Sequence, residues 1–355
     1  MSYTNGLDKP TDYFNTVLWT GDGTDDRNIT GVGFQPDMVW EKKRSEAGSH
    51  RIADSIRGVT NVLFPDLTNA ETSRPNEFQS FISDGFQIGS DDNFNGSSKT
   101  YVGWSWLAGT AFSNDASATG VGSIDSSGSI NTTAGFSIIS WTGSGSAATI
   151  AHGLGSKLSM YIVRNRTDVE DWIVYHGANT SAPETDYLQL NANNATGDSS
   201  GVWNDTAPTS SVFSVGTANS TNGSSDNMIA YCFAEKKGYS KFGSYTGNAN
   251  ADGTFIYTGF KPAWFMVKNT AASEHWRIYD NKRDSFNHMF RCIFPNQNSA
   301  ESTVDNASEE IDFLSNGVKI RSNAQQLNGS GQTLIYAAFA ESPFVTSTGI
   351  PTTAR

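Results

Sequence analysis

The chain of 355 residues has little charge and almost no cysteine. Charged residues make up only 17% of it, against about a quarter in an average globular protein, so Ser, Thr, Asn and Gly must form much of the surface. One of its two cysteines, Cys232, lies on a strand of small residues, and we interpret it as a buried free thiol rather than as a disulfide partner or metal ligand. This composition favours a rigid, turn-rich β protein.

Basic residues and long apolar runs are also scarce. The formal net charge is −12, and an acidic surface repels the phosphates of nucleic acids and anionic membranes. No apolar stretch has the length of a membrane helix, and the N-terminus lacks the basic and apolar regions of a signal peptide. We therefore expect no nucleic-acid partner, no membrane insertion, and a protein kept in the cytoplasm until it joins an assembly.

One apolar strand pattern occurs three times. In the first copy, Val102, Trp104 and Trp106 are two residues apart and line one face of a strand, while the alternate positions are small or apolar. A strand without a charged face is typical of the middle of a sheet covered on both sides. An Asn-Gly pair, which favours a tight hairpin turn with positive backbone angles, precedes each copy. The copies are Asn95-Gly96 with 99–109, Asn222-Gly223 with 228–235, and Asn328-Gly329 with 334–341.

Further landmarks repeat in one register. Trp19, Trp141 and Tyr245 are equivalent, and the separations of 122 and 104 residues between them also relate other motifs. Such an internal triplication predicts three similar units, and short apolar runs between turn signals are typical of a sandwich or barrel. The sequence thus predicts an all-β fold of three tandem antiparallel β-sandwich repeats, jelly-roll or concanavalin-like, of about 100 residues each.

These repeats define the expected domain boundaries. A polar arm precedes them, a Ser/Gly/Thr-rich segment between the first two is either a linker or an edge strand, and a polar tail ends the chain. Features shared by all copies are best explained as scaffold, so we expect specific function where the copies differ. The expected parts are the arm at 1–12, repeat 1 at 13–110, the linker or edge strand at 111–134, repeat 2 at 135–236, repeat 3 at 237–344 and the tail at 345–355.

Patterns that indicate catalysis are missing from the sequence. The five histidines lack the spacing of a nucleophile, base and acid triad, and no Gly-x-Ser-x-Gly elbow occurs. Neighbouring acids such as Asp25 and Asp26 point apart on a strand and cannot flank one glycosidic bond. We expect no enzymatic activity and no cofactor.

Two weak candidates for binding sites remain. Asp91, Asn93 and Asn95 match the first half of a calcium loop. Val102 stands where that loop needs a bidentate Glu, so we expect no metal. Trp203 lies in a loop outside the repeated core positions, and together with Asn204 it is the candidate for stacking on a glycan.

A cation stands at the end of one strand in every copy. These residues are Lys42, Arg164 and Lys268, and they share the repeat register. We expect a structural ion pair, or a side chain that reaches from the strand to solvent, rather than capture of a ligand.

Five strings in the chain, 33–40, 83–86, 134–139, 149–155 and 162–166, carry a resemblance to a known family. They resemble tailed-bacteriophage virion proteins, common in marine phages and usually labelled tail-fibre, tail or structural proteins. The resemblance covers nearly all of 13–344, with one departure at Leu158, where the family pattern has proline and the turn is expected to be looser. It implies no catalytic residues.

The resemblance implies a location on the outside of a phage particle that is assembled in a bacterial cytoplasm. There the chain would be a non-enzymatic structural protein for attachment or reinforcement, as a tail fibre or tail appendage or as a capsid decoration. Its partners would be other virion proteins and host-surface glycans, and it would form a homo-oligomer. The alternative is a carbohydrate-binding module or a glycan-cleaving receptor-binding protein.

Overall fold

The computed structural model describes residues 7–303, 305 and 308–352. The predicted all-β class is confirmed, because the helices among these residues are single turns. None of them is long and apolar enough to span a lipid bilayer. The helical turns are η1 (Pro10–Asp12), α1 (Asp92–Asn95), α2 (Ala116–Thr119), α3 (Ser200–Trp203), α4 (Asn219–Asn222) and α5 (Gln325–Asn328).

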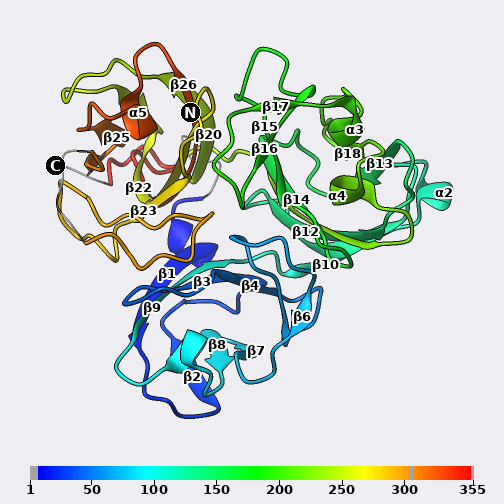
Figure 1. Ribbon diagram of the computed structural model, residues 1–355, viewed down its shortest axis with the longest axis horizontal. Helices are drawn as coiled ribbons and strands as arrows, with labels where there is room; N and C mark the ends of the chain where they lie inside the picture. Colours follow the sequence, from blue (N-terminus) through cyan, green and yellow to red (C-terminus); the bar gives the residue numbers. More distant parts are fainter. Residues whose placement is uncertain (1–6, 304, 306–307, 353–355) are drawn as a thin grey trace.

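The strands form three lobes around a common centre (Figure 1). Each lobe is a sandwich of an inner sheet, which faces the centre, and a smaller outer sheet. Lobe 1 contains β1 (Phe14–Thr20), β2 (Arg27–Thr30), β3 (Met38–Lys43), β4 (Arg51–Asp54), β5 (Asn61–Val62), β6 (Thr72–Ser73), β7 (Phe78–Ile82), β8 (Gly85–Ile88) and β9 (Thr100–Trp106). Lobe 2 contains β10 (Thr110–Asn114), β11 (Ser126–Asn131), β12 (Phe136–Thr142), β13 (Ala148–Ala151), β14 (Met160–Asn165), β15 (Ile173–His176), β16 (Asp186–Gln189), β17 (Gly197–Asp198), β18 (Val212–Val215) and β19 (Asn227–Phe233). Lobe 3 contains β20 (Ser240–Thr246), β21 (Phe255–Tyr257), β22 (Phe260–Asn269), β23 (Arg277–Asp280), β24 (Ile311–Leu314), β25 (Gly317–Ile320) and β26 (Thr333–Pro343).

The three inner sheets share one strand order. It reads β1-β9-β3-β4 in lobe 1, β12-β19-β14-β15 within the larger sheet of lobe 2, and β20-β26-β22-β23 in lobe 3. The repeated apolar strand is β9, β19 or β26, and it lies between two neighbours each time, as its two apolar faces predict. The registers also agree, since Trp19 pairs with Tyr101, Trp141 with Met228 and Tyr245 with Leu334.

Each inner sheet is covered on both faces. On β9, Val102, Trp104 and Trp106 join a core at the centre of the molecule that takes residues from all three lobes. The opposite face belongs to the separate core of lobe 1, where a Cβ on Gly103 would lie 3.2 Å from the rings of Phe86 and Trp19. The alternation of the strand thus divides its side chains between two cores.

The polar segment at 111–134 extends the sheet of lobe 2. β10 and β11 add two strands beside β12, and Ile124 forms a parallel bridge with Ile150 of the outer sheet. The sequence predicted either a linker or an edge strand here. The structure shows edge strands, and most of the segment belongs to the sheet of lobe 2.

The Asn-Gly pairs differ from the expected hairpin turns. Each Asn ends a helical turn, and the following glycines, Gly96, Gly223 and Gly329, have φ between −56° and −52° instead of positive values. The glycine instead leaves room for a neighbouring polar side chain, because a Cβ there would lie within 2.2 Å of a side-chain oxygen of Asp92, Asp226 or Gln332. The signal for a glycine was correct, and the predicted turn type was wrong.

Candidate functional site

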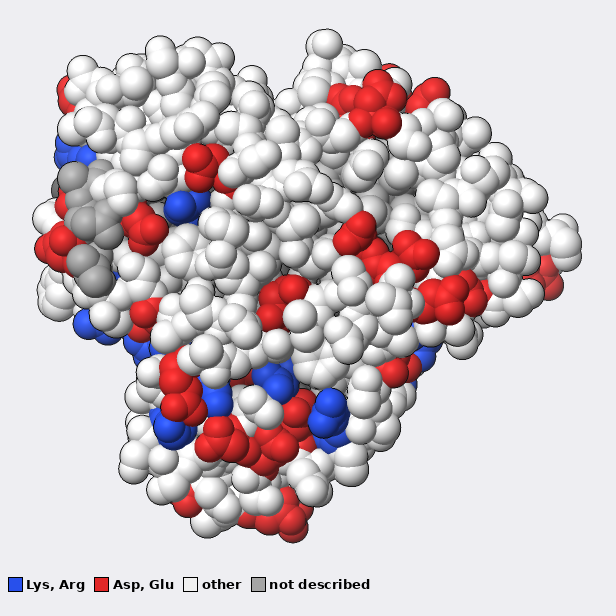
Figure 2. All heavy atoms as spheres, in the orientation of Figure 1, with Lys and Arg blue, Asp and Glu red and all other residues white. Residues whose placement is uncertain are grey.

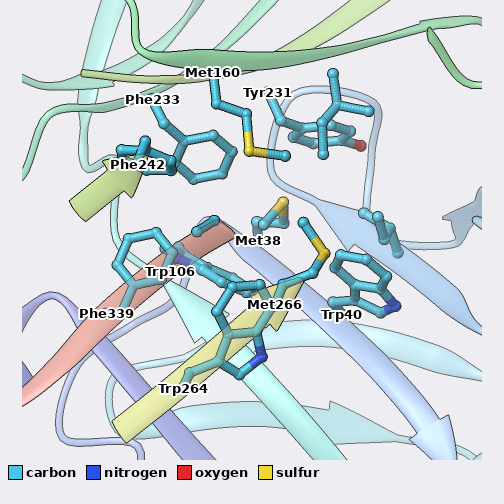
Figure 3. Close-up of a pocket in the computed structure, with 13 residues that line it drawn as sticks. Met38, Trp40, Trp106, Met160, Tyr231, Phe233, Phe242, Trp264, Met266 and Phe339 are labelled. Carbon is cyan, nitrogen blue, oxygen red and sulfur yellow. The ribbon is translucent and has the colours of Figure 1, made fainter. Parts of the chain in front are cut away.

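The centre of the molecule is the first concave region to consider. Apolar side chains from the inner sheets of all three lobes converge there, and Figure 3 shows Met38, Met160 and Met266 pointing toward one another within a ring of aromatic residues. The cavity left between them measures only about 20 Å³ and is lined by apolar side chains. A space of that size holds at most one water, which would lack hydrogen-bond partners. We interpret the centre as a packed core and not as a ligand pocket.

A layer of hydrogen bonds next to this core joins the lobes in a cycle. The Trp104 indole of lobe 1 donates to Asp280 of lobe 3 over 3.0 Å, and the Tyr231 hydroxyl of lobe 2 donates to Asp54 of lobe 1 over 2.6 Å. The third contact places His176 Nε2 of lobe 2 at 3.1 Å from a backbone carbonyl oxygen of lobe 3. Asp54, His176 and Asp280 are equivalent in the repeats, so one position makes all three contacts.

A second cycle uses the residue directly before the strand that ends at Asp54, His176 or Asp280. Trp172 of lobe 2 donates to the carbonyl of Phe64 in lobe 1, and Trp276 of lobe 3 donates to the carbonyl of Gln189 in lobe 2. In lobe 1 the equivalent residue is His50, whose Nε2 lies 3.0 Å from a carbonyl oxygen of lobe 3. Lobe 1 therefore contacts lobe 2, lobe 2 contacts lobe 3, and lobe 3 closes the ring on lobe 1.

Two of the three predicted strand-end cations, Arg164 and Lys268, belong to the same ring. Arg164 donates to the carbonyls of Thr68 and Asn69 in lobe 1, and Lys268 donates to the carbonyl of Asn193 in lobe 2. Lys42 donates to the carbonyl of the residue that follows it. All three cations are fully buried and form no ion pair that the structure shows, which differs from both expectations. Burial lowers the pKa of Lys42 and of Lys268 to about 8 and that of Arg164 to about 10.

Buried and partly buried ion pairs reinforce two of the three interfaces. Between lobes 1 and 2, Glu71 binds both Arg57 and Arg166. Between lobes 3 and 1, Glu301 binds both Arg283 and Arg44 in the corresponding way. At the third interface, between lobes 2 and 3, the Thr196 amide donates to the Thr270 carbonyl over 2.9 Å. The Thr196 hydroxyl donates within lobe 2 to Asn179, whose repeat equivalents are Arg57 and Arg283.

The glycan candidate Trp203 does not offer a ring to solvent. Its side chain is fully buried in the core of lobe 2, its indole donates to the carbonyl of Asp186 over 3.0 Å, and its ring meets that of Tyr161. Asn204 is exposed and ends α3 in the left-handed conformation. The expectation of a stacking platform at Trp203 is wrong, because the short helix α3 turns this side chain inward.

The calcium candidates do not converge on one cation position. Asp91 caps α1 through bonds to the backbone and side chain of Asn93. The side chain of Asn95 binds Asp22 and the carbonyl of Thr24, and its oxygen accepts from the Arg27 guanidinium. A guanidinium at that oxygen repels a second cation, and Asn222 and Asn328 make corresponding turn contacts in the other lobes. The arrangement fits a structural turn.

The histidines have mainly structural surroundings. Burial lowers the pKa of His152 and of His176 to about 4 and that of His50 well below its ordinary value, so these imidazoles are neutral near pH 7. Among the described residues, one group of possible metal ligands comes together: His288, Asp305 and Glu310, with ligand atoms within 4.8 Å of one another. Two of these three side chains are exposed, and they could supply three ligands to a divalent cation.

An open hollow lies on lobe 3. It is a groove of about 640 Å³ between the connection from lobe 2, the end of β21 and the chain after β26. Tyr257, 60% exposed, stands at its side. Strand pairing makes Tyr257 equivalent to Thr30 in lobe 1 and Ala151 in lobe 2, so only lobe 3 has an aromatic ring here. The sequence did not reveal this residue, because the separations of 122 and 104 residues align Thr30 with His152 and Ile256, and the equivalence with Tyr257 emerges from strand pairing.

Residues 9–343 match the sequence profile of a family described as Domain of unknown function (DUF7483). A search of curated proteins gave no match.

Proposed function

The chain belongs to the family described as Domain of unknown function (DUF7483), and from this premise we propose that it is a non-enzymatic structural protein on the surface of a bacteriophage particle. In that role it serves attachment or reinforcement, as a tail fibre or tail appendage or as a capsid decoration. Its partners are other virion proteins and host-surface glycans.

The observation that carries the proposal is the closed ring of three sandwiches. Each lobe is held to both others by buried hydrogen bonds, so the lobes support one another as a rigid body. The groups that are most deeply buried at the interfaces are used for cohesion and not for chemistry on a ligand. A rigid body of this kind is suited to attachment or reinforcement on the surface of a particle.

The outer surface agrees with the same role. On the face shown in Figure 2 most atoms belong to uncharged residues, and basic side chains gather mainly around lobe 1 beside acidic ones. A mostly neutral, hydroxyl- and amide-rich surface with a net charge of −12 keeps a protein soluble and repels nucleic acid. The resemblance of strings such as 33–40 and 149–155 to virion proteins supports the location.

Head and tail remain equal candidates for that location. Virion heads and tails are symmetric assemblies, and a body with three similar lobes can contact three equivalent subunits of either one. The homo-oligomer also remains a prediction.

Counting the chain in purified particles tests the role. Quantitative mass spectrometry of particles of the phage that encodes the chain would give its copy number relative to the major head and tail proteins. A number comparable to the head protein indicates decoration, and a small number indicates a tail appendage. Absence from purified particles would contradict the proposal.

A second candidate function is carbohydrate binding, with one observation in its favour. Trp203, the residue first considered for it, is buried, but Tyr257 exposes a ring beside a groove in a lobe-specific position. This candidate is compatible with a virion location.

A further inference from the structure

We propose that His288, Asp305 and Glu310 of lobe 3 bind a divalent metal ion of the zinc type. All three residues belong to the connection between β23 and β24, with the histidine near its start and the two carboxylates near its end. One ligand atom from each side chain lies within 4.8 Å of the other two. The connection therefore brings together a set of ligands that its sequence order keeps apart.

The spacing of the ligand atoms fits a metal ion. His288 Nε2 lies 3.3 Å from Asp305 Oδ1, whereas a usual N–H···O hydrogen bond measures about 2.9–3.0 Å. Two ligands that bind Zn²⁺ at about 2.0–2.2 Å in tetrahedral geometry are about 3.3–3.6 Å apart. The Glu310 carboxylate is within 4.8 Å of both atoms, so rotation of its flexible side chain can complete a set of three ligands.

The ligand types select the metal. One imidazole and two carboxylates suit Zn²⁺, whereas Ca²⁺ and Mg²⁺ prefer oxygen ligands alone. The two carboxylates balance the charge of a divalent ion, and Arg291 of the same connection has a carboxylate partner of its own in Asp284, 3.3 Å away. The side chains of His288 and Asp305 are 46% and 56% exposed, so water can reach the ion and occupy a fourth position.

Four hydrogen bonds hold the histidine beside β24. On one side of His288, the backbone of Met289 exchanges bonds of 2.7 and 3.0 Å with that of Ile311. On the other side, the Asn287 side chain donates to the Phe313 carbonyl and accepts from the Phe313 N–H, each over 2.9 Å. The imidazole is thus carried by a segment that is fixed to a strand before any metal binds.

The same pairing places two ligands on one side of the backbone. Met289 and Ile311 face each other in the core of lobe 3, with 2% and 0% of their surface exposed. Side chains of neighbouring residues in extended segments point to opposite sides. His288 and Glu310, each next to one of these core residues, therefore point outward together.

The scaffold does not require this histidine. In lobe 3, Ile278 forms a bridge with Ile293, which is 15 positions later. The corresponding bridge in lobe 1 joins Ile52 to Leu63, which are only 11 positions apart. The segment that carries His288 is therefore four residues longer than its counterpart, and an addition that one copy makes to a shared scaffold is a place where we expect specific function.

The scaffold does not require the Glu310 carboxylate either. In lobe 1 the buried Arg51 forms an ion pair of 2.9 Å with Glu77. The equivalent arginine of lobe 3, Arg277, lies 3.9 Å from Glu309. Glu310 is therefore not the partner of this arginine, and its carboxylate lies beside the other two ligands instead.

Titration with metal salts tests the site. After treatment with a chelator, we expect the full chain to bind one Zn²⁺ in isothermal titration calorimetry and to melt at a higher temperature with ZnCl₂ than without it. Excess MgCl₂ or CaCl₂ should not displace the Zn²⁺. The absence of saturable Zn²⁺ binding, or tighter binding of Ca²⁺ than of Zn²⁺, would overturn the assignment. Metal binding is a property of the chain alone, so its failure would leave the virion role untouched.

Three variants and a control locate the bound ion. His288→Ala, Asp305→Asn and Glu310→Gln each remove one ligand and should weaken Zn²⁺ binding by at least about tenfold, with an unchanged melting temperature of the metal-free chain. The matched control is His275→Gln, which removes another partly exposed histidine of lobe 3 that is outside the cluster. The control should bind Zn²⁺ as the wild type does. Equal weakening in the control, or wild-type affinity in the three ligand variants, would contradict the site.

Discussion

Substituting Glu301 should clearly lower the stability of the chain, because this carboxylate joins lobe 3 to lobe 1 and so closes the ring. It is 4% exposed and accepts from Arg283, which is fully buried, and from Arg44, which is 12% exposed and belongs to another lobe. Glu301→Gln keeps the shape but removes the charge that two buried guanidinium groups share. Removing one partner from a buried ion pair typically costs about 3–5 kcal/mol, because the other charge stays buried without compensation. In this variant Arg44 loses its carboxylate partner, while Arg283 keeps its ion pair with Asp280, so we expect the lower end of that range.

The expected effect on thermal stability follows from the chain length. With an unfolding entropy of about 2.1 cal/mol/K per residue, the whole chain has roughly 0.75 kcal/mol/K, so the melting temperature should fall by about 4 °C. Differential scanning calorimetry measures this fall. Hydrogen exchange adds a local test, because the Gly48 amide donates to the Asn298 carbonyl across the same interface and should exchange faster in the variant.

Glu46→Gln is the matched control. Glu46 also binds two cations, Lys43 and Lys99, but it is 38% exposed and all three residues belong to lobe 1. Solvent screens such pairs, so this variant should melt close to the wild type. The amide of Glu71, which bonds across the other ionic interface, should keep its exchange rate in both variants. Equal melting temperatures for the Glu301 and Glu46 variants would refute the claim that the Glu301 ion pairs between lobes 3 and 1 stabilise the chain.

Two further substitutions test the packing. Trp104→Ala should lower the free energy of unfolding by about 3–5 kcal/mol in urea titrations, because a fully buried ring is lost; an unchanged midpoint would show that the residue is outside a core. Glu41 is buried and has no hydrogen-bond partner among the described residues. Burial raises its pKa well above the ordinary value, so its carboxylate destabilises the fold increasingly as pH rises above about 4.5. Glu41→Val, which introduces the residue found at Val163 and Val267, should therefore stabilise the chain more at pH 8 than at pH 4.5, and a gain independent of pH would contradict this reasoning.

Much of the architecture could be predicted because it depends on local periodicity. The alternation in Val102, Trp104 and Trp106 was enough to place β9 in the middle of a sheet, and the fixed separations revealed its two equivalents. Turn geometry was less predictable. Gly96 leaves room for the Asp92 side chain and has a negative φ, and a sequence does not distinguish these two reasons for glycine.

Contacts between lobes could not be predicted from repeat spacing. The separations show that Lys42, Arg164 and Lys268 are equivalent, but not that Arg164 and Lys268 bind backbone carbonyls of a neighbouring lobe. Trp203 failed as a candidate for a related reason, since a loop position says little about burial when a short helix directs the side chain inward. Tyr257 could not be compared with its equivalents from the separations alone, because these align Thr30 with His152 and Ile256, and strand pairing is needed to align Tyr257 with Thr30 and Ala151.

The central claim is that this ring of three sandwiches works on the outside of a phage particle. Immunogold labelling of intact, purified particles with an antibody against the folded chain tests it most directly. The account predicts gold on the outer surface of the particle, on the head for a decoration protein or on the tail for an appendage. Particles that stay unlabelled while the chain is found only in the host lysate would contradict it.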